Sequence, residues 1–124
     1  MQSVLTARLA AKNALATVLP RDRVLYAGAS QPTGGTYAVL TVVSAPAVND
    51  WGGEAYSPVR VQVDVWSYAP TDTTALTTAE QGRVALEAAG FRRVGGGLPI
   101  GVEGQPDAAG NRWQRVSSDY VQIA

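Results

Sequence analysis

Three carboxylates, Asp64, Asp72 and Glu80, are the first candidates for catalysis, because the chain contains no Cys and no His. The absence of both residues excludes disulfides, thiolate nucleophiles, Cys/His zinc sites and triads with an imidazole base. A catalytic pair needs two carboxyl groups held close together, often with one raised pKa. Each of these three has an ordinary structural role instead: charge on a strand face, a helix cap and a solvated helix face. We therefore expect no catalytic residue, no cofactor and no metal site, although an all-oxygen Mg²⁺ or Ca²⁺ site is possible in principle.

The run Gly95-Gly96-Gly97 is a second candidate, because glycine-rich loops bind phosphate groups through their backbone amides. No Gly-Lys-Ser/Thr follows the run, and no clear helix begins there to offer its N-terminus. The whole segment 95–111 is rich in Gly and Pro. We therefore expect it to be a mobile loop without a phosphate site.

Four arginines, Arg92, Arg93, Arg112 and Arg115, could contact the phosphates of a nucleic acid. A nucleic-acid-binding domain usually has an excess of clustered basic charge. Here Lys plus Arg is 10 and Asp plus Glu is 10, so the formal net charge is zero and the arginines are scattered. We therefore expect no specific nucleic-acid binding, and we interpret these arginines as solvated residues or as part of a protein interface.

Two aromatic residues, Trp51 and Tyr56, lie in a segment that otherwise has the composition of a polar loop. Trp and Tyr are enriched at the energetically dominant positions of protein interfaces. The two rings either fold back as a lid on the core or form a contact surface together with Asp50 and Glu54. The sequence leaves both alternatives open.

The next segment, 58–68, combines charged and aromatic side chains on one face. Valines occupy every second position from 59 to 65, and the alternate positions include Arg60, Asp64 and Trp66. Strict alternation with β-branched residues predicts a strand. A face that is half polar and half aromatic suits coverage by another subunit, and it also suits partial coverage by a helix.

These residues must be positioned by six elements. Apolar periodicity and the placement of Gly and Pro predict helices over 2–18 and 73–89, and strands over 36–44, 58–68, 91–94 and 112–123. The strands 36–44 and 58–68 are expected to pair antiparallel across the long loop between them. Strands paired in hairpins with helices on one face form a two-layer domain. The expected fold is α+β, a small antiparallel β-sheet with two helices packed on one face, in a single domain over 1–124.

Local signals predict finer features of these elements. Near one face of the first helix lie Leu5, Leu9, Lys12 and Leu15, with Ala10, Ala11, Ala14 and Ala16 filling in. Asp72 or Thr71 is expected to cap the second helix. Apolar residues of opposite parity in the last strand predict a bulge or burial on both faces near 117–118.

Length and charge limit the class of protein further. The 124 residues suit one domain. No apolar run approaches the roughly 20 residues of a membrane span, and the N-terminus lacks the pattern of a signal peptide. A neutral chain, with only 16% charged residues, has little electrostatic defence against self-association.

Three stretches carry a resemblance to a known family: Thr36-Tyr37-Ala38-Val39-Leu40, Val61-Gln62-Val63-Asp64-Val65-Trp66-Ser67 and Arg115-Val116-Ser117-Ser118-Asp119-Tyr120-Val121. With the order of elements, they resemble the tail completion (tail terminator) proteins of long-tailed bacteriophages and phage-like particles. In that family a strand like the second stretch leads directly into a helix of modest length. The resemblance covers nearly the whole chain and brings no catalytic residue with it.

The resemblance implies a virion structural protein that forms a homohexameric ring at the head-proximal end of the tail tube. Such rings end tube polymerisation and join the tail to the head connector, so the implied partners are copies of itself, the tail tube protein and connector proteins. DNA passes through the lumen without specific binding, and the implied location is the neck of the virion, after assembly in the host cytoplasm. The alternatives are another head–tail connector or tail-tube subunit, or a monomeric, non-catalytic ligand-binding α+β domain. We expect the interface to include Asp50, Trp51, Glu54, Tyr56, Arg60, Asp64, Trp66, Arg92, Arg93, Arg112 and Arg115.

Overall fold

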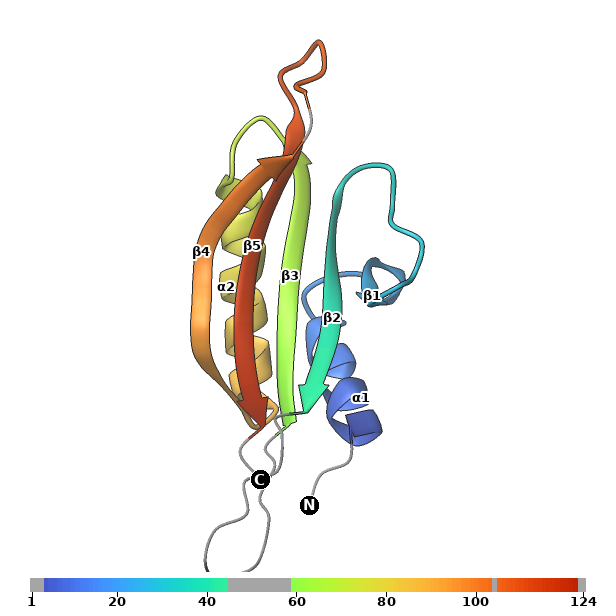
Figure 1. Cartoon of the computed structure of the whole chain (residues 1–124), viewed down its shortest axis with the longest axis vertical. Helices are drawn as coiled ribbons and strands as arrows, with labels where there is room; N and C mark the ends of the chain where they lie inside the picture. The colour runs from blue at the N-terminus through green and yellow to red at the C-terminus, as the bar shows by residue number, and fades with distance from the viewer. Residues whose placement is uncertain (1–3, 45–58, 104, 123–124) are drawn as a thin grey trace, which may run out of the picture.

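The computed structural model describes residues 4–44, 59–103 and 105–122, which form two layers (Figure 1). A five-stranded sheet is one layer, and two helices lie against one of its faces. The α+β class predicted from the sequence is confirmed. The elements in chain order are α1 (Val4–Leu15), the short 3-10 helix η1 (Arg21–Arg23), β1 (Val24–Tyr26), β2 (Thr36–Ser44), β3 (Val59–Ala69), α2 (Thr73–Ala88), β4 (Phe91–Glu103) and β5 (Arg112–Gln122).

The strands follow the order β1-β2-β3-β5-β4 across the sheet. β2 and β3 pair antiparallel, as predicted, with Ala38 opposite Val65 and Leu40 opposite Val63. β5 pairs antiparallel with both β3 and β4. The sheet is nevertheless mixed rather than purely antiparallel, because β1 pairs parallel with β2. β1 has only three residues, too few to show a strand period in the sequence.

The core lies between the sheet and the helices. The valines of β3 are buried on that side, as their alternation predicts. They share one apolar cluster with Leu40 of β2, Leu86 of α2, Phe91 of β4 and Tyr120 of β5. Burial of each large apolar side chain contributes about 1.5–3 kcal/mol, so this cluster is the main stabilising contact between the two layers.

Only part of the face predicted for α1 is buried. Ala7, Ala11 and Leu15 are buried, whereas Leu5 and Leu9 are 70% and 50% exposed. Small side chains let the helix approach the sheet and α2 closely, and a Cβ at Gly82 of α2 would lie 3.0 Å from Leu15 Cδ2. The predicted face is therefore confirmed at Ala11, Ala14 and Leu15 and is wrong at Leu5 and Leu9.

β4 corrects the prediction for the glycine-rich segment. The strand predicted over 91–94 continues to Glu103 and pairs with β5, so most of the expected loop is sheet. The irregularity predicted near 117–118 lies on β4 instead, where the register shifts at three places opposite a continuous β5. Gly96 and Gly97 have φ values of 84° and 88°, which favour glycine. Glycine therefore marks bulges here and not a loop.

α2 begins directly after β3, at the position that the sequence indicates. Asp72 occupies the N-cap position, but its side chain makes no capping hydrogen bond, so the predicted role of this side chain is wrong. Thr71 Oγ1 instead donates a hydrogen bond to Thr73 Oγ1 at 3.3 Å. Within residues 4–44, 59–103 and 105–122, no helix is long and apolar enough to cross a membrane.

Candidate functional site

The face of the sheet opposite the helices, here called the helix-free face, carries every second side chain of the three central strands. Strand pairing aligns these side chains in rows across the sheet. They are Tyr37, Val39 and Thr41 of β2, Arg60, Gln62, Asp64, Trp66 and Tyr68 of β3, and Trp113, Arg115, Ser117, Asp119 and Val121 of β5. Four residues that the sequence assigns to an interface, Arg60, Asp64, Trp66 and Arg115, therefore share one face.

Four rings on this face form a cluster, here called the aromatic cluster: Tyr37, Trp66, Tyr68 and Trp113. The Trp113 centroid lies 5.5 Å from that of Tyr37, 6.5 Å from that of Trp66 and 5.1 Å from that of Tyr68. Tyr37 and Trp66 stack with 6.4 Å between centroids and 10° between planes. Each such pair contributes roughly 0.5–1.5 kcal/mol beyond its burial. The cluster therefore links β2, β3 and β5.

A pocket of about 220 Å³ opens beside the aromatic cluster. Gln31 and Pro32, from the connection between β1 and β2, line it together with Tyr37, Trp66 and Trp113. Tyr37 is only 1% exposed although it lies on the helix-free face. Among the described residues its lining contains no carboxylate and no basic side chain, so the pocket has no group for acid–base chemistry.

Asp64 is a buried carboxylate in the middle of the helix-free face, with 8% of its surface exposed. Ser117 Oγ donates a short hydrogen bond to its Oδ1. Gln62 Nε2 lies 3.4 Å from Oδ1 and 3.2 Å from Oδ2 of the same carboxylate. Among the described residues the salt bridges lie within α2 alone, so neutral donors satisfy this carboxylate. The arrangement is that of a structural network between β3 and β5.

Arg115 lies in the row next to Asp64 but turns to the aromatic cluster. Its Cζ is 5.0 Å from the Trp66 ring centroid, a cation–π contact. Its Nε is buried and has no hydrogen-bond partner among the described residues. A guanidinium held on a ring in this way remains a potential donor to a group outside the monomer.

The three carboxylates considered for chemistry do not come together. Asp64 binds Ser117 in the sheet, Asp72 precedes α2, and Glu80 forms an ion pair with Arg83 on the same helix. In the ranges that the structure describes, no group of three or more His, Cys, Asp or Glu residues could hold a metal ion.

The other predicted arginines lie in three places. Arg92 and Arg60 both pair with Val121, so they lie in one row of the helix-free face. Arg93 pairs with Tyr120, a core residue, and its guanidinium approaches Gly97. Arg112 begins β5. The structure therefore brings Arg60, Arg92 and Arg115 onto one face and leaves Arg93 and Arg112 elsewhere. The predicted residues Asp50, Trp51, Glu54 and Tyr56 lie outside the described residues.

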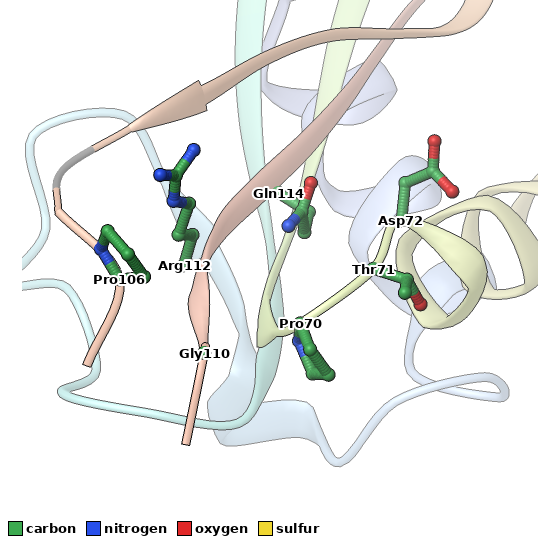
Figure 2. Close-up of a pocket in the computed structure, with 7 residues that line it drawn as sticks. All are labelled: Pro70, Thr71, Asp72, Pro106, Gly110, Arg112 and Gln114. Carbon is green, nitrogen blue, oxygen red and sulfur yellow. The ribbon is translucent and has the colours of Figure 1, made fainter. Parts of the chain in front are cut away.

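Arg112 lines a second, larger pocket of about 490 Å³ at the end of the sheet where α2 begins (Figure 2). In Figure 2 the side chains of Arg112 and Asp72 stand on either side of Gln114, whose Nε2 donates a hydrogen bond to the Ala69 carbonyl at 3.2 Å. The remaining lining residues are Pro70, Thr71, Pro106 and Gly110. Gln114 thus joins β5 to the end of β3 at the base of this hollow.

Asp107 organises the turn between β4 and β5 beside this pocket. Its Oδ1 accepts hydrogen bonds from the backbone amides of Ala109 and Asn111, both at 2.9 Å. Its Oδ2 accepts one from Tyr68 Oη at 3.0 Å. The hydrogen bond from the Asn111 backbone amide has the largest effect on Asp107, and it lowers the pKa of this carboxyl group. The hydrogen bond to Asp107 in turn raises the pKa of Tyr68. The aromatic cluster is in this way tied to the turn.

Sequence reasoning missed Tyr37 and Trp113 as site residues. Tyr37 has the parity of Val39 in a strand that is apolar on both faces, so alternation alone did not mark it. Trp113 stands two residues before Arg115, and this shared parity was the available signal. Only the registers of β2–β3 and β3–β5 place both rings beside Trp66.

Comparison with known proteins identifies the family. The family model described as tail completion protein gp17 matches residues 3–120. Among solved structures, a chain of the "Virion of native gene transfer agent (GTA) particle" is 19% identical, with 94% of each chain covered and a TM-score of 0.43. The search of curated proteins returned no significant match. The family match spans nearly the whole chain and confirms the resemblance noted in the sequence: the chain is a structural protein of a phage tail and belongs to the tail completion protein gp17 family.

Proposed function

We propose that the protein forms a homohexameric ring at the head-proximal end of the tail tube. There it ends tube polymerisation and joins the tail to the head connector, in the neck of the virion. The observation that carries the proposal is the family match over residues 3–120. The partners of the ring are copies of itself, the tail tube protein and connector proteins.

The helix-free face supports the proposal as a contact surface. It combines the aromatic cluster with exposed Arg60 and Arg92 and with the Arg115 guanidinium. Aromatic and arginine side chains are the residues that dominate binding energy in protein interfaces. A ring needs two different surfaces on each subunit, since a patch on one copy meets another patch on the next. We propose the helix-free face as a contact of the ring with its neighbours or with the tail tube.

The charge of the chain suits a ring through which DNA moves. Ten basic residues balance ten acidic ones, so the subunit adds no net attraction for phosphates. Affinity for duplex DNA arises mostly from release of counterions by basic side chains. A neutral ring therefore lets DNA slide without gripping it.

Imaging of particles that lack this gene tests the function. We expect tails of abnormal length and tails without heads, because nothing ends the tube or joins it to the connector. Normal tails attached to heads would contradict the proposal. Heads without any tail tube would identify a tail-tube subunit instead. Expression of the wild-type chain in trans is the control and should restore infectious particles.

The same complementation assay tests the proposed contact residues. Trp51→Ala with Tyr56→Ala, and separately Arg60→Glu with Arg92→Glu, should lower the yield of joined particles at least tenfold. Arg83→Glu is unsuitable as a control because it would disrupt ion pairs on α2. Thr74→Glu, at an exposed position of α2 in the layer on the other side of the sheet, is the matched control. Full complementation by either double variant would remove those residues from the interface.

A further inference from the structure

The outer face of α1 exposes two leucines, one helical turn apart, that the core does not use. Leu5 and Leu9 are 70% and 50% exposed, while the opposite face of the helix packs into the core through alanines and Leu15. Two leucines spaced by four residues form a continuous apolar stripe on a helix. Contiguous exposed apolar residues on a small domain are typical of contact sites.

Basic side chains border this stripe. α1 contains Arg8 and Lys12 and no acidic residue. Both cations lie over the Tyr26 ring, with Arg8 Cζ at 3.8 Å and Lys12 Nζ at 4.8 Å from its centroid. The ring therefore holds the two charges on the β1 side of the stripe, ready for an acidic partner.

The outer face of α2 has the complementary layout. Val84 is 56% exposed, and Glu80 and Glu87, four residues before it and three after it, lie close to it on the helix surface. Arg83 holds both carboxylates: it forms a short ion pair with Glu80 and a 2.8 Å pair with Glu87 Oε1. With two acids and one base, α2 is net negative where α1 is net positive.

We propose that the outer face of α1 in one subunit packs against the outer face of α2 in the next copy of this chain. Leu5 and Leu9 contact Val84, and Arg8 and Lys12 face Glu80 and Glu87. Contacts of each face with itself are disfavoured, because α1 against α1 brings four cations together without an acid, and α2 against α2 brings four carboxylates together with only two arginines. Two different, complementary faces give a head-to-tail contact, which closes into a ring when the rotation permits.

The proposal rests on the proposed ring and names the surfaces that join its subunits. It also predicts that two variants with defects on different faces can still bind each other, which a contact of one face with itself does not allow. A subunit with a defective α1 face keeps a functional α2 face, so two complementary defective variants can still form one contact with each other.

Disulfide cross-linking tests the contact, because the chain contains no cysteine. Leu9→Cys and Val84→Cys are made as separate single variants, mixed, and assembled on isolated tails and at high protein concentration. We expect oxidation to give a covalent dimer at least tenfold more abundant in the mixture than in either variant alone. Ser30→Cys mixed with Val84→Cys is the matched control, and it should assemble like the other mixture but give no covalent dimer.

The outcomes separate this proposal from the proposed function. Three results would each overturn the proposed contact and leave the ring intact. They are ring assembly without the mixed cross-link, a cross-link between two Leu9→Cys chains, and a cross-link of Leu9→Cys protein to another tail protein. Absence of any assembly in both preparations would overturn the ring as well. As a second measurement, Leu5→Asp/Leu9→Asp protein mixed with Val84→Asp protein should give dimers and no larger species by native mass spectrometry, and continued ring formation would refute the contact.

Discussion

Among the glycines whose surroundings the structure describes, Gly96 in β4 is the position where one added methyl group should cost most. Its φ of 84° is unfavourable for any residue with a Cβ. A Cβ there would lie 2.7 Å from Ser118 Cα and closer still to the Ser117 carbonyl oxygen, both backbone atoms of β5. Because those atoms belong to a paired central strand, they cannot move aside like the end of a flexible side chain. Gly96→Ala must therefore push β4 away from β5.

The expected cost has two parts. An alanine in the left-handed conformation costs about 1–2 kcal/mol. Separation of the strands weakens the pairing around Gly96, which joins Gly95 to Asp119, Gly96 to Ser118 and Leu98 to Ser117. Loss of two or three hydrogen bonds at about 1 kcal/mol each adds about 2–3 kcal/mol. We expect a total of about 3–5 kcal/mol.

Gly110 provides a matched control. Its φ is 85°, nearly that of Gly96, but a Cβ at this position would meet nothing within 4 Å. Gly110→Ala should therefore cost only the backbone part, about 1–2 kcal/mol. Urea unfolding monitored by tryptophan fluorescence measures both variants. Equal losses of free energy of unfolding would refute the argument that close approach of β4 to β5 requires glycine at 96.

Three further predictions concern the site and the turn beside it. Asp64→Ala leaves the Ser117 hydroxyl and the Gln62 amide without their acceptor. It should lower the free energy of unfolding in urea by about 1–3 kcal/mol. The control Asp72→Ala removes no capping hydrogen bond and should lower it clearly less. Trp113→Ala removes the ring shared by three aromatic pairs and should cost about 2 kcal/mol, below the 3–5 kcal/mol of a fully buried ring. The lowered pKa of Asp107 means that its stabilisation of the turn is complete above its ordinary value of 3.8 and is lost as the pH falls below it through the folded-state value. Amide exchange of Asn111 should lose protection in that range, and Asp107→Asn should abolish this pH dependence.

The fold was predictable from the sequence where a segment showed a regular period of apolar residues. The valine alternation located β3 to within one residue at each end, and the same holds for the C-terminal end of α2. The prediction of a loop after residue 94 was wrong for most of β4, because glycine and proline indicate loops when they are interpreted locally. Here pairing with β5 decides the conformation of the segment. The helix α1 was predicted, but Leu5 and Leu9 were placed on its buried face wrongly for a related reason: leucine is the stronger apolar residue, whereas close packing against the sheet and α2 selects alanine.

The site was predictable only in part for the same physical reason. Alternation in β3 was enough to place Arg60, Asp64 and Trp66 on one face. It could not place Tyr37 or Trp113 beside Trp66, because strand register is a property of the pairing between segments. Nor could it show that Asp64 would be buried, since burial depends on neighbours that the register supplies.

The edges of the sheet bear on how copies of this chain can associate. One edge is β1, only three residues long, and the other is β4, whose register shifts at three places and whose glycines have positive φ. Short strands and bulges are the features by which proteins prevent edge-to-edge pairing. β1 covers β2 only at Ala38–Leu40, so the regular open edge that the described residues leave is the short end of β2 beyond β1. Strand edges this short or irregular favour joining the proposed ring through faces, and the described residues offer two with unused contact groups: the helix-free face with its aromatic cluster, and the helix layer with its exposed leucines.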